Sequence, residues 1–123
     1  MQHEWETLCQ IATREIENTI QHMPEQLRES VKNLPVLFET SPNEALITEG
    51  MAPDTLGYFS GREFSDAGDE VLPPQIVLFL RNIEDFAEYD LPVYQVEVKT
   101  TFLHEVGHYF GLDEGELEAR GLE

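Results

Sequence analysis

Residues 92–114 read PVYQVEVKTTFLHEVGHYFGLDE, and this stretch decides how the chain can be interpreted. Within it, the letters HEVGH at positions 104–108, followed by a glycine and an acid, form the pattern H-E-x-x-H-x-x-G-x-x-E. His104 and His108 are four residues apart, so on a helix they lie on one face, about one turn from each other. The spacing therefore predicts a helix over 92–110 on which both imidazoles can reach a single metal ion.

A helical wheel of residues 93–110 separates the two histidines from the apolar side chains. The apolar side chains that gather on one broad side are Val98, Phe102, Leu103, Val106, Tyr109 and Phe110. His104 and His108 lie almost opposite them, with Glu97 and Thr101 nearby. We therefore expect the histidines to face a cleft or a second layer, and not to belong to the main hydrophobic core.

The residues after the helix supply candidates for a third ligand. Gly111 stands where a left-handed glycine ends a helix. Asp113 and Glu116 then have the spacing of an N-cap aspartate and its capping-box partner, which gives Asp113 a structural task. Glu114 opens the new turn and stays available to the metal, so we expect Glu114 to be the third ligand, with Asp113 as the alternative.

These parts predict a zinc-dependent peptidase. Two neutral imidazoles and one carboxylate leave the fourth position of a tetrahedral Zn²⁺ ion open for water. The cation lowers the pKa of that water from ~16 toward ~7, and Glu105 can accept its proton as general base and pass it to the leaving amine. The sequence does not choose an oxyanion donor among the eligible side chains, which are His3, His22, Tyr58, Tyr89, Tyr94 and Tyr109.

The rest of the chain alternates helical and extended patterns. The elements expected from periodicity and punctuation are a helix over 3–23, a helix from Pro24 to Leu34, a strand over 36–39, loops over 40–74 with a short hairpin around Tyr58 and Phe59, a strand over 75–81, and a helix capped by Asn82 that runs through Tyr89. The 75–81 strand, QIVLFLR, is apolar on both faces. It is either a central core strand or, if one edge is free, a track for an extended peptide substrate.

Composition narrows the classes of protein that fit. The length of 123 residues predicts a single domain spanning 1–123. A net charge of −18 argues against nucleic-acid partners and anionic membranes, and the chain has no apolar run of transmembrane length. The single cysteine, Cys9, and a start without a secretory pattern predict a cytoplasmic protein. The acidity either only solvates the surface or also attracts basic substrate segments.

The stretch HEVGHYFGLDE resembles the zincin-like metallopeptidases, and in particular the small bacterial minimal zincins. The blocks LGYFSG at 56–61 and LPPQIVLFLRNI at 72–83 are also similar to that family. The resemblance implies a small α+β domain with N-terminal helices, a short mixed sheet and a long C-terminal active-site helix. It also implies His104, His108 and Glu114 as zinc positions, Glu105 as base, and a peptide or protein substrate.

Two better-known groups of zinc peptidases differ from this chain. Metzincins have histidine where Glu114 stands and a methionine turn downstream, whereas Met1, Met23 and Met51 all precede the motif here. Thermolysin-like enzymes take their ligand glutamate from a separate later helix, for which the nine residues after Glu114 leave no room.

A competing hypothesis is a non-catalytic module with the same shape that binds metal or protein partners. Its motivation is the small size of the chain, which leaves little material for substrate subsites or a lid. Glu105 favours the enzyme, because a site that only holds metal has no need of that carboxylate.

Overall fold

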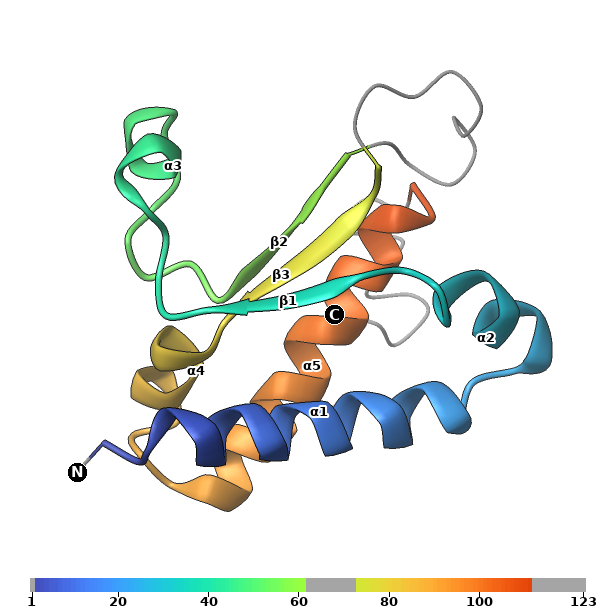
Figure 1. Ribbon diagram of the computed structural model, residues 1–123, viewed down its shortest axis with the longest axis horizontal. Helices are drawn as coiled ribbons and strands as arrows, with labels where there is room; N and C mark the ends of the chain where they lie inside the picture. The colour runs from blue at the N-terminus through green and yellow to red at the C-terminus, as the bar shows by residue number, and fades with distance from the viewer. Residues whose placement is uncertain (1, 62–72, 112–123) are drawn as a thin grey trace.

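The structure is a computed structural model and describes residues 2–61 and 73–111 (Figure 1). The elements in chain order are α1 (Trp5–Gln21), α2 (Glu25–Val31), β1 (Val36–Glu39), α3 (Glu44–Thr48), β2 (Gly57–Ser60), β3 (Gln75–Phe79), α4 (Leu80–Phe86) and α5 (Leu91–Tyr109). Helices precede and follow a short mixed sheet, and the long helix α5 carries the histidine motif. The expected α+β class is therefore confirmed.

The three strands form one sheet in the order β1-β3-β2. β3 pairs in parallel with β1, where Phe38 lies beside Leu78, and antiparallel with β2, where Gly57 lies beside Leu78 on the other side. Both edges of β3 are thus occupied. Of the two alternatives for the 75–81 segment, the central core strand is confirmed and the free edge for a peptide is wrong, because β3 is paired on both sides.

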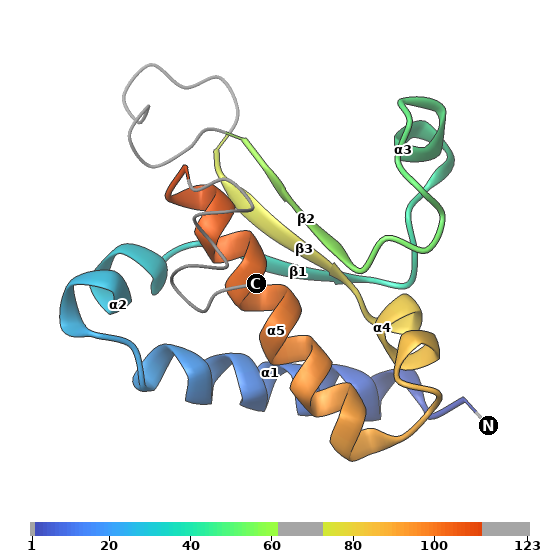
Figure 2. The same cartoon turned by 180° about the vertical axis from the view of Figure 1, so that it is seen from behind.

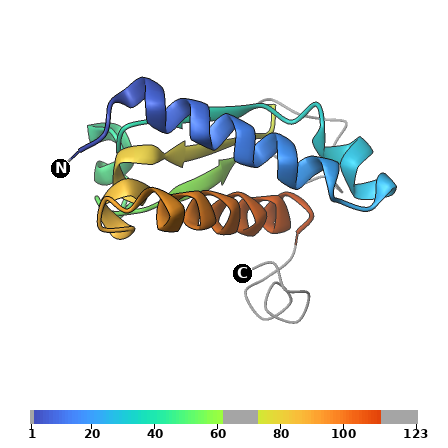
Figure 3. The same cartoon turned by 90° about the horizontal axis from the view of Figure 1, so that it is seen from below.

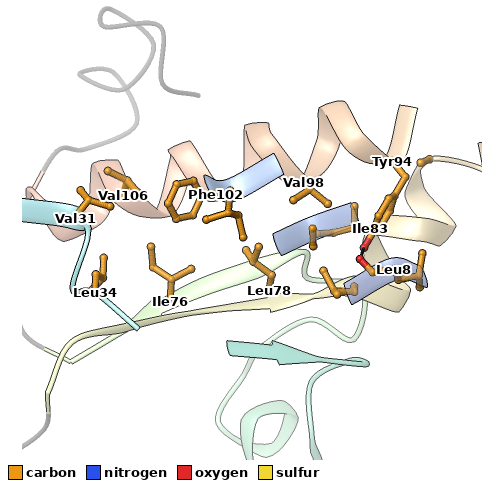
Figure 4. Close-up of a cluster of buried hydrophobic side chains, with 14 of the residues drawn as sticks. Leu8, Val31, Leu34, Ile76, Leu78, Ile83, Tyr94, Val98, Phe102 and Val106 are labelled. Carbon is orange, nitrogen blue, oxygen red and sulfur yellow. Dashed lines mark hydrogen bonds between the residues drawn. The ribbon is translucent and has the colours of Figure 1, made fainter. Parts of the chain in front are cut away.

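Helices α1 and α5 lie side by side on the same face of the sheet (Figure 3). The core between these layers contains Ile76 and Leu78 from β3, Phe102 from α5 and Leu8 from α1, all with no exposed surface (Figure 4). Val98, Phe102 and Val106 of α5 are buried as the helical wheel predicts. Burial of this stripe fixes how α5 is rotated about its own axis.

Local chemistry sets both ends of α5. The Asp90 side chain accepts a hydrogen bond of 3.0 Å from the backbone N–H of Val93, and Pro92 occupies the first turn, where its missing N–H costs nothing. Beyond Tyr109, Gly111 has a φ of +76° and its N–H donates to the carbonyl of His108. The glycine that the sequence placed after the helix therefore ends it as expected.

The boundary between β3 and α4 differs from the sequence-based expectation. The strand ends at Phe79, and α4 already begins at Leu80. Asn82 does not cap this helix, because its amide donates hydrogen bonds of 2.8 and 2.9 Å to the carbonyls of Pro53 and Thr55. The helix ends at Phe86, before the residues expected to continue it through 89, since Glu88 and Tyr89 both take a left-handed backbone conformation.

Three other segments differ from expectation. Residues 44–48 form the short helix α3, capped by the Asn43 side chain, where loop was predicted. Tyr58 and Phe59 belong to β2, which pairs antiparallel with β3, the next strand along the chain, so their partner strand lies beyond the 40–74 segment in which the hairpin was expected. The second helix ends at Val31, three residues earlier than predicted.

Among the described residues, no helix combines the length and hydropathy needed to cross a membrane.

A buried ionic cluster joins the segment before α1 to α4. Glu84 is 1% exposed, and its carboxylate accepts hydrogen bonds from the His3 backbone N–H at 2.6 Å and from Arg81 Nη1 at 2.9 Å. Nδ1 of the His3 ring lies 3.0 Å from the same carboxylate, and Arg81 also donates to the His3 carbonyl. Desolvation raises the pKa of Glu84, but the hydrogen bonds from His3 and Arg81 outweigh it and hold that pKa below its usual value.

We predict that Glu84→Gln lowers the free energy of unfolding at pH 7 by about 2–4 kcal/mol. The variant replaces the buried carboxylate that accepts hydrogen bonds from the His3 backbone N–H and the Arg81 guanidinium. A carboxyl whose pKa is lowered by folding contributes stability above its unfolded pKa, and this contribution is lost as the pH falls through the folded value. The wild-type protein should therefore lose more stability than the variant when urea unfolding is repeated below about pH 4.

Glu29→Gln is the matched control. Glu29 and Lys32 form an ion pair with the same i,i+3 spacing, at 2.8 Å, but both side chains are at least half exposed. Solvent screens such a pair, so this variant should unfold with nearly the wild-type midpoint. Equal losses in the two variants would contradict a special role for the Glu84 cluster.

The strand β2 and the helix α5 approach each other closely at Gly57. A Cβ atom built there would lie 2.9 Å from Thr101 Cγ2, 2.9 Å from the Val77 carbonyl oxygen and 3.0 Å from Leu78 Cδ2. These separations are too short for ordinary van der Waals contact. Only glycine therefore permits this distance between β2 and α5.

We predict that Gly57→Ala destabilises the protein by about 1–3 kcal/mol, because the added methyl group overpacks the junction. Adding Thr101→Ser removes the Cγ2 atom and should restore part of the loss, which a double-mutant cycle in chemical unfolding measures. A cycle without positive coupling would show that the clash does not lie between these two residues.

Candidate metal centre and adjoining pocket

The two motif histidines converge at their ring nitrogens. Nε2 of His104 lies 3.1 Å from Nε2 of His108, and the rings meet edge to face with centroids 4.7 Å apart. Both side chains are partly exposed, as expected for residues outside the core stripe. The i,i+4 spacing on a regular helix produces this convergence, as the sequence predicted.

The separation of the two nitrogens fits a shared metal ion. Zn–N bonds of about 2.0–2.1 Å at a tetrahedral angle place two ligand nitrogens about 3.3 Å apart. The observed 3.1 Å is close to that value. The two Nε2 atoms could thus become ligands with little rearrangement of either ring.

Glu105 lies beside the histidines in a more protected position. Its residue is 6% exposed, and it contributes to the wall of a pocket of about 290 Å³. The pocket lies between the start of β2 and one side of α5, and its lining residues are Leu56, Gly57, Glu97, Thr100, Thr101, His104 and Glu105. A carboxylate and an imidazole on the wall of one small pocket can together bind and deprotonate a polar molecule.

The structure does not place the predicted third ligand. Glu114 and the alternative, Asp113, both lie outside the described residues, as does the capping partner Glu116. Within residues 2–61 and 73–111, no group of three or more His, Cys, Asp or Glu side chains could hold a metal ion. The described part of the site therefore consists of the histidine pair and Glu105.

Most eligible oxyanion donors are engaged elsewhere. Tyr94 is fully buried, and its hydroxyl donates to the Leu8 carbonyl. Tyr89 lies in the turn before α5, and its hydroxyl donates to the Asp85 carboxylate of α4. His3 contacts Glu84, and His22 contacts its own helix at the Asn18 carbonyl.

The remaining two candidates lie on opposite faces of the sheet. Tyr58 stacks on Phe79, at 5.8 Å between ring centroids, on the face of the sheet opposite Leu78 and the helices. Tyr109 lies on α5 next to His108, and burial raises the pKa of its hydroxyl. Tyr109 is thus the candidate next to the motif in sequence, but it lies on the apolar side of α5, where its ring packs on Phe59 with centroids 5.7 Å apart.

The β-strand side of the pocket was not recognised from the sequence. Gly57 and Leu56 were interpreted as part of a loop, and Glu97 and Thr101 were noted only as neighbours of the histidines on the wheel. The one feature of the sequence that could have pointed to a close contact at Gly57 is its place directly before the aromatic pair at 58–59. Its meaning depends on α5 lying against β2, which local sequence does not reveal.

Comparison with known proteins identifies the family of this chain. The family model described as zincin-like metallopeptidase matches residues 31–122, about three quarters of the chain. The matched segment contains the sheet, the pocket and the whole histidine motif. A search of curated proteins finds no match to the chain. The resemblance inferred from the motif is confirmed, and the chain belongs to the zincin-like metallopeptidase family.

Proposed function

We propose that this protein is a zinc-dependent peptidase in which His104, His108 and Glu114 hold the metal and Glu105 is the general base. The observation that carries the proposal is the 3.1 Å separation of the two Nε2 atoms, together with the buried Glu105, which lines the same pocket as His104. A pure metal-holding site has no need of that glutamate. Membership of a metallopeptidase family supports the same reaction.

The residues divide the work by their positions. When bound, zinc supplies a water molecule of lowered pKa and polarises a carbonyl oxygen. His104 and His108 would supply their neighbouring Nε2 atoms as two ligands, and Glu114 would supply a carboxylate as the third. Glu105 accepts the proton of the attacking water and transfers it to the amine that leaves when the peptide bond breaks.

Burial suits Glu105 to this task. Glu105 is 6% exposed, so its carboxylate has little contact with bulk water and is held in place by the protein around it. A base held in this way can be positioned precisely against a substrate. The pocket between β2 and α5 is the place for substrate in this proposal. A peptide there would lie next to β2, an edge strand of the described sheet, to which it could add by backbone hydrogen bonds.

We predict that Glu105→Gln lowers kcat/KM on peptides by about 10²–10⁴-fold, because the variant loses its proton acceptor while the shape of the pocket is kept. Zinc content after purification, measured by plasma emission spectroscopy, should stay stoichiometric. His104→Ala should lose both zinc and cleavage.

His22→Ala is the matched control for the loss of one imidazole. This histidine is exposed at the end of α1, and among the described residues its ring forms a hydrogen-bond contact with the Asn18 carbonyl of its own helix. The variant should keep wild-type zinc content and wild-type cleavage.

Full activity of Glu105→Gln would exclude the proposed base. Stoichiometric zinc with no cleavage in a broad peptide library would favour the non-catalytic module.

We predict that Glu114→Ala lowers zinc affinity without a large loss of stability in the metal-free protein. Asp113→Ala should instead lower the free energy of unfolding by about 1 kcal/mol and retain zinc, because its proposed role is to cap the turn that follows Gly111. Competitive titration against a zinc chelator and chemical unfolding of both metal-free variants provide the two readouts. The reverse pattern would assign Asp113 as the ligand.

A further inference from the structure

Glu97 is a carboxylate in the pocket that the proposed reaction does not use. It lies on α5, it is half-buried, and it contributes to the same wall as His104 and Glu105. Its side chain makes no hydrogen bond and no ion pair within the described part of the chain. A carboxylate in a pocket without a protein partner is available to a ligand of opposite charge.

The position of Glu97 is defined by the helix. Glu97 and His104 are seven positions apart in the sequence. Seven helical steps turn the chain by about 700°, about 20° short of two full turns, so the two side chains lie almost on one line along α5. The rise of the helix places them about 10 Å apart along its axis. An extended peptide advances about 3.3 Å per residue, so this distance corresponds to about three residues of substrate.

The wall opposite Glu97 leaves room for a long side chain. The space is the pocket itself, about 290 Å³, and not the position of Gly57, which is tightly packed; Leu56 presents an aliphatic surface on the pocket wall. Lysine and arginine combine an aliphatic stem with a cationic end, and such side chains pack the stem on apolar surface while the charge contacts an acid. The excess of 25 acids over 7 bases adds a long-range attraction for cationic segments.

We propose that Glu97 is a specificity-determining residue, which selects peptides with a lysine or arginine side chain within about three residues of the scissile bond. The assignment rests on the proposed function, because it places the scissile bond at His104 and Glu105. The cationic nitrogen contacts the Glu97 carboxylate, and its stem lies between Leu56 and Thr100.

A side chain suits this position better than a free amino terminus. In an aminopeptidase substrate the terminal ammonium lies one residue from the scissile bond, about 3.3 Å along an extended backbone. That distance is too short to reach a carboxylate about 10 Å further along the helix axis. The ammonium or guanidinium group of an internal residue covers the remaining gap with its own length.

The test compares binding and cleavage of matched peptides. Fluorescein-labelled decapeptides with one lysine at each position in turn are compared with peptides that carry norleucine there, which keeps the stem and removes the charge. Binding is measured by anisotropy on the zinc-loaded Glu105→Gln protein, so that no peptide is cleaved. An amino-terminally acetylated set distinguishes a side chain from a terminal ammonium.

We expect lysine at one or two adjacent positions to tighten binding about five- to tenfold over norleucine, as for a partly desolvated ion pair. This preference should weaken with added salt. It should disappear when Glu97→Gln is added. It should persist with Glu49→Gln, which removes the same charge from an exposed residue just after α3, a helix that lies away from α5 (Figure 2). The ratio of kcat/KM for the two peptides in the enzyme with Glu105 intact should follow the same pattern.

Equal binding of lysine and norleucine peptides, or a preference that survives Glu97→Gln, would overturn the assignment. Binding that falls on acetylation equally for the lysine and norleucine peptides, without a difference between the two side chains, would identify the terminal ammonium as the ligand and would also overturn it. If no peptide is cleaved by the protein with Glu105 intact, the proposed peptidase fails, but the anisotropy comparison still decides whether Glu97 selects a cation.

Discussion

The site depends on how α5 is held against the sheet and α1. Phe102 and Val98 have no exposed surface, and they pack in one cluster with Ile76, Leu78 and residues of α1. A helix with such a stripe cannot rotate without exposing these side chains, and each costs about 1.5–3 kcal/mol to expose. The rotation of α5 is therefore fixed by residues that take no part in the chemistry. His104, His108 and Glu97 lie outside the stripe as a consequence.

The pocket follows from a second constraint, the close approach of β2 to α5. Residues four apart on the helix, Thr101 and Glu105, are buried on the side that faces β2, and Gly57 permits the contact. Glu105 is consequently protected from bulk water, whereas the histidines next to it remain partly exposed. This difference in exposure suits the two proposed roles, because a base benefits from a defined position and ligands must be reachable by an ion.

The elements that the sequence predicted well are those with strong local signals. The long helix follows from the proline in its first turn, the helical spacing of its apolar residues and the glycine after it, whereas its cap at Asp90 was recognised only in the structure. Strand β3 follows from consecutive β-branched and apolar residues. The predictions failed where a local signal had a competing tertiary partner: Asn82 has the side chain of a helix cap, yet it donates to two carbonyls of the 53–55 segment. The short helix α3 was missed because five residues carry almost no periodicity.

The sequence by itself determined the chemistry that this protein can carry. The spacing of His104 and His108 on a helix places two imidazoles on one face whatever the fold around them, and Glu105 accompanies them, because helical geometry acts over only a few residues. Only the tertiary structure decided what surrounds that chemistry. It enclosed β3 between two strands, brought Gly57 to Thr101, and placed Glu97 on a pocket wall, since these relations join segments tens of residues apart that no local pattern connects.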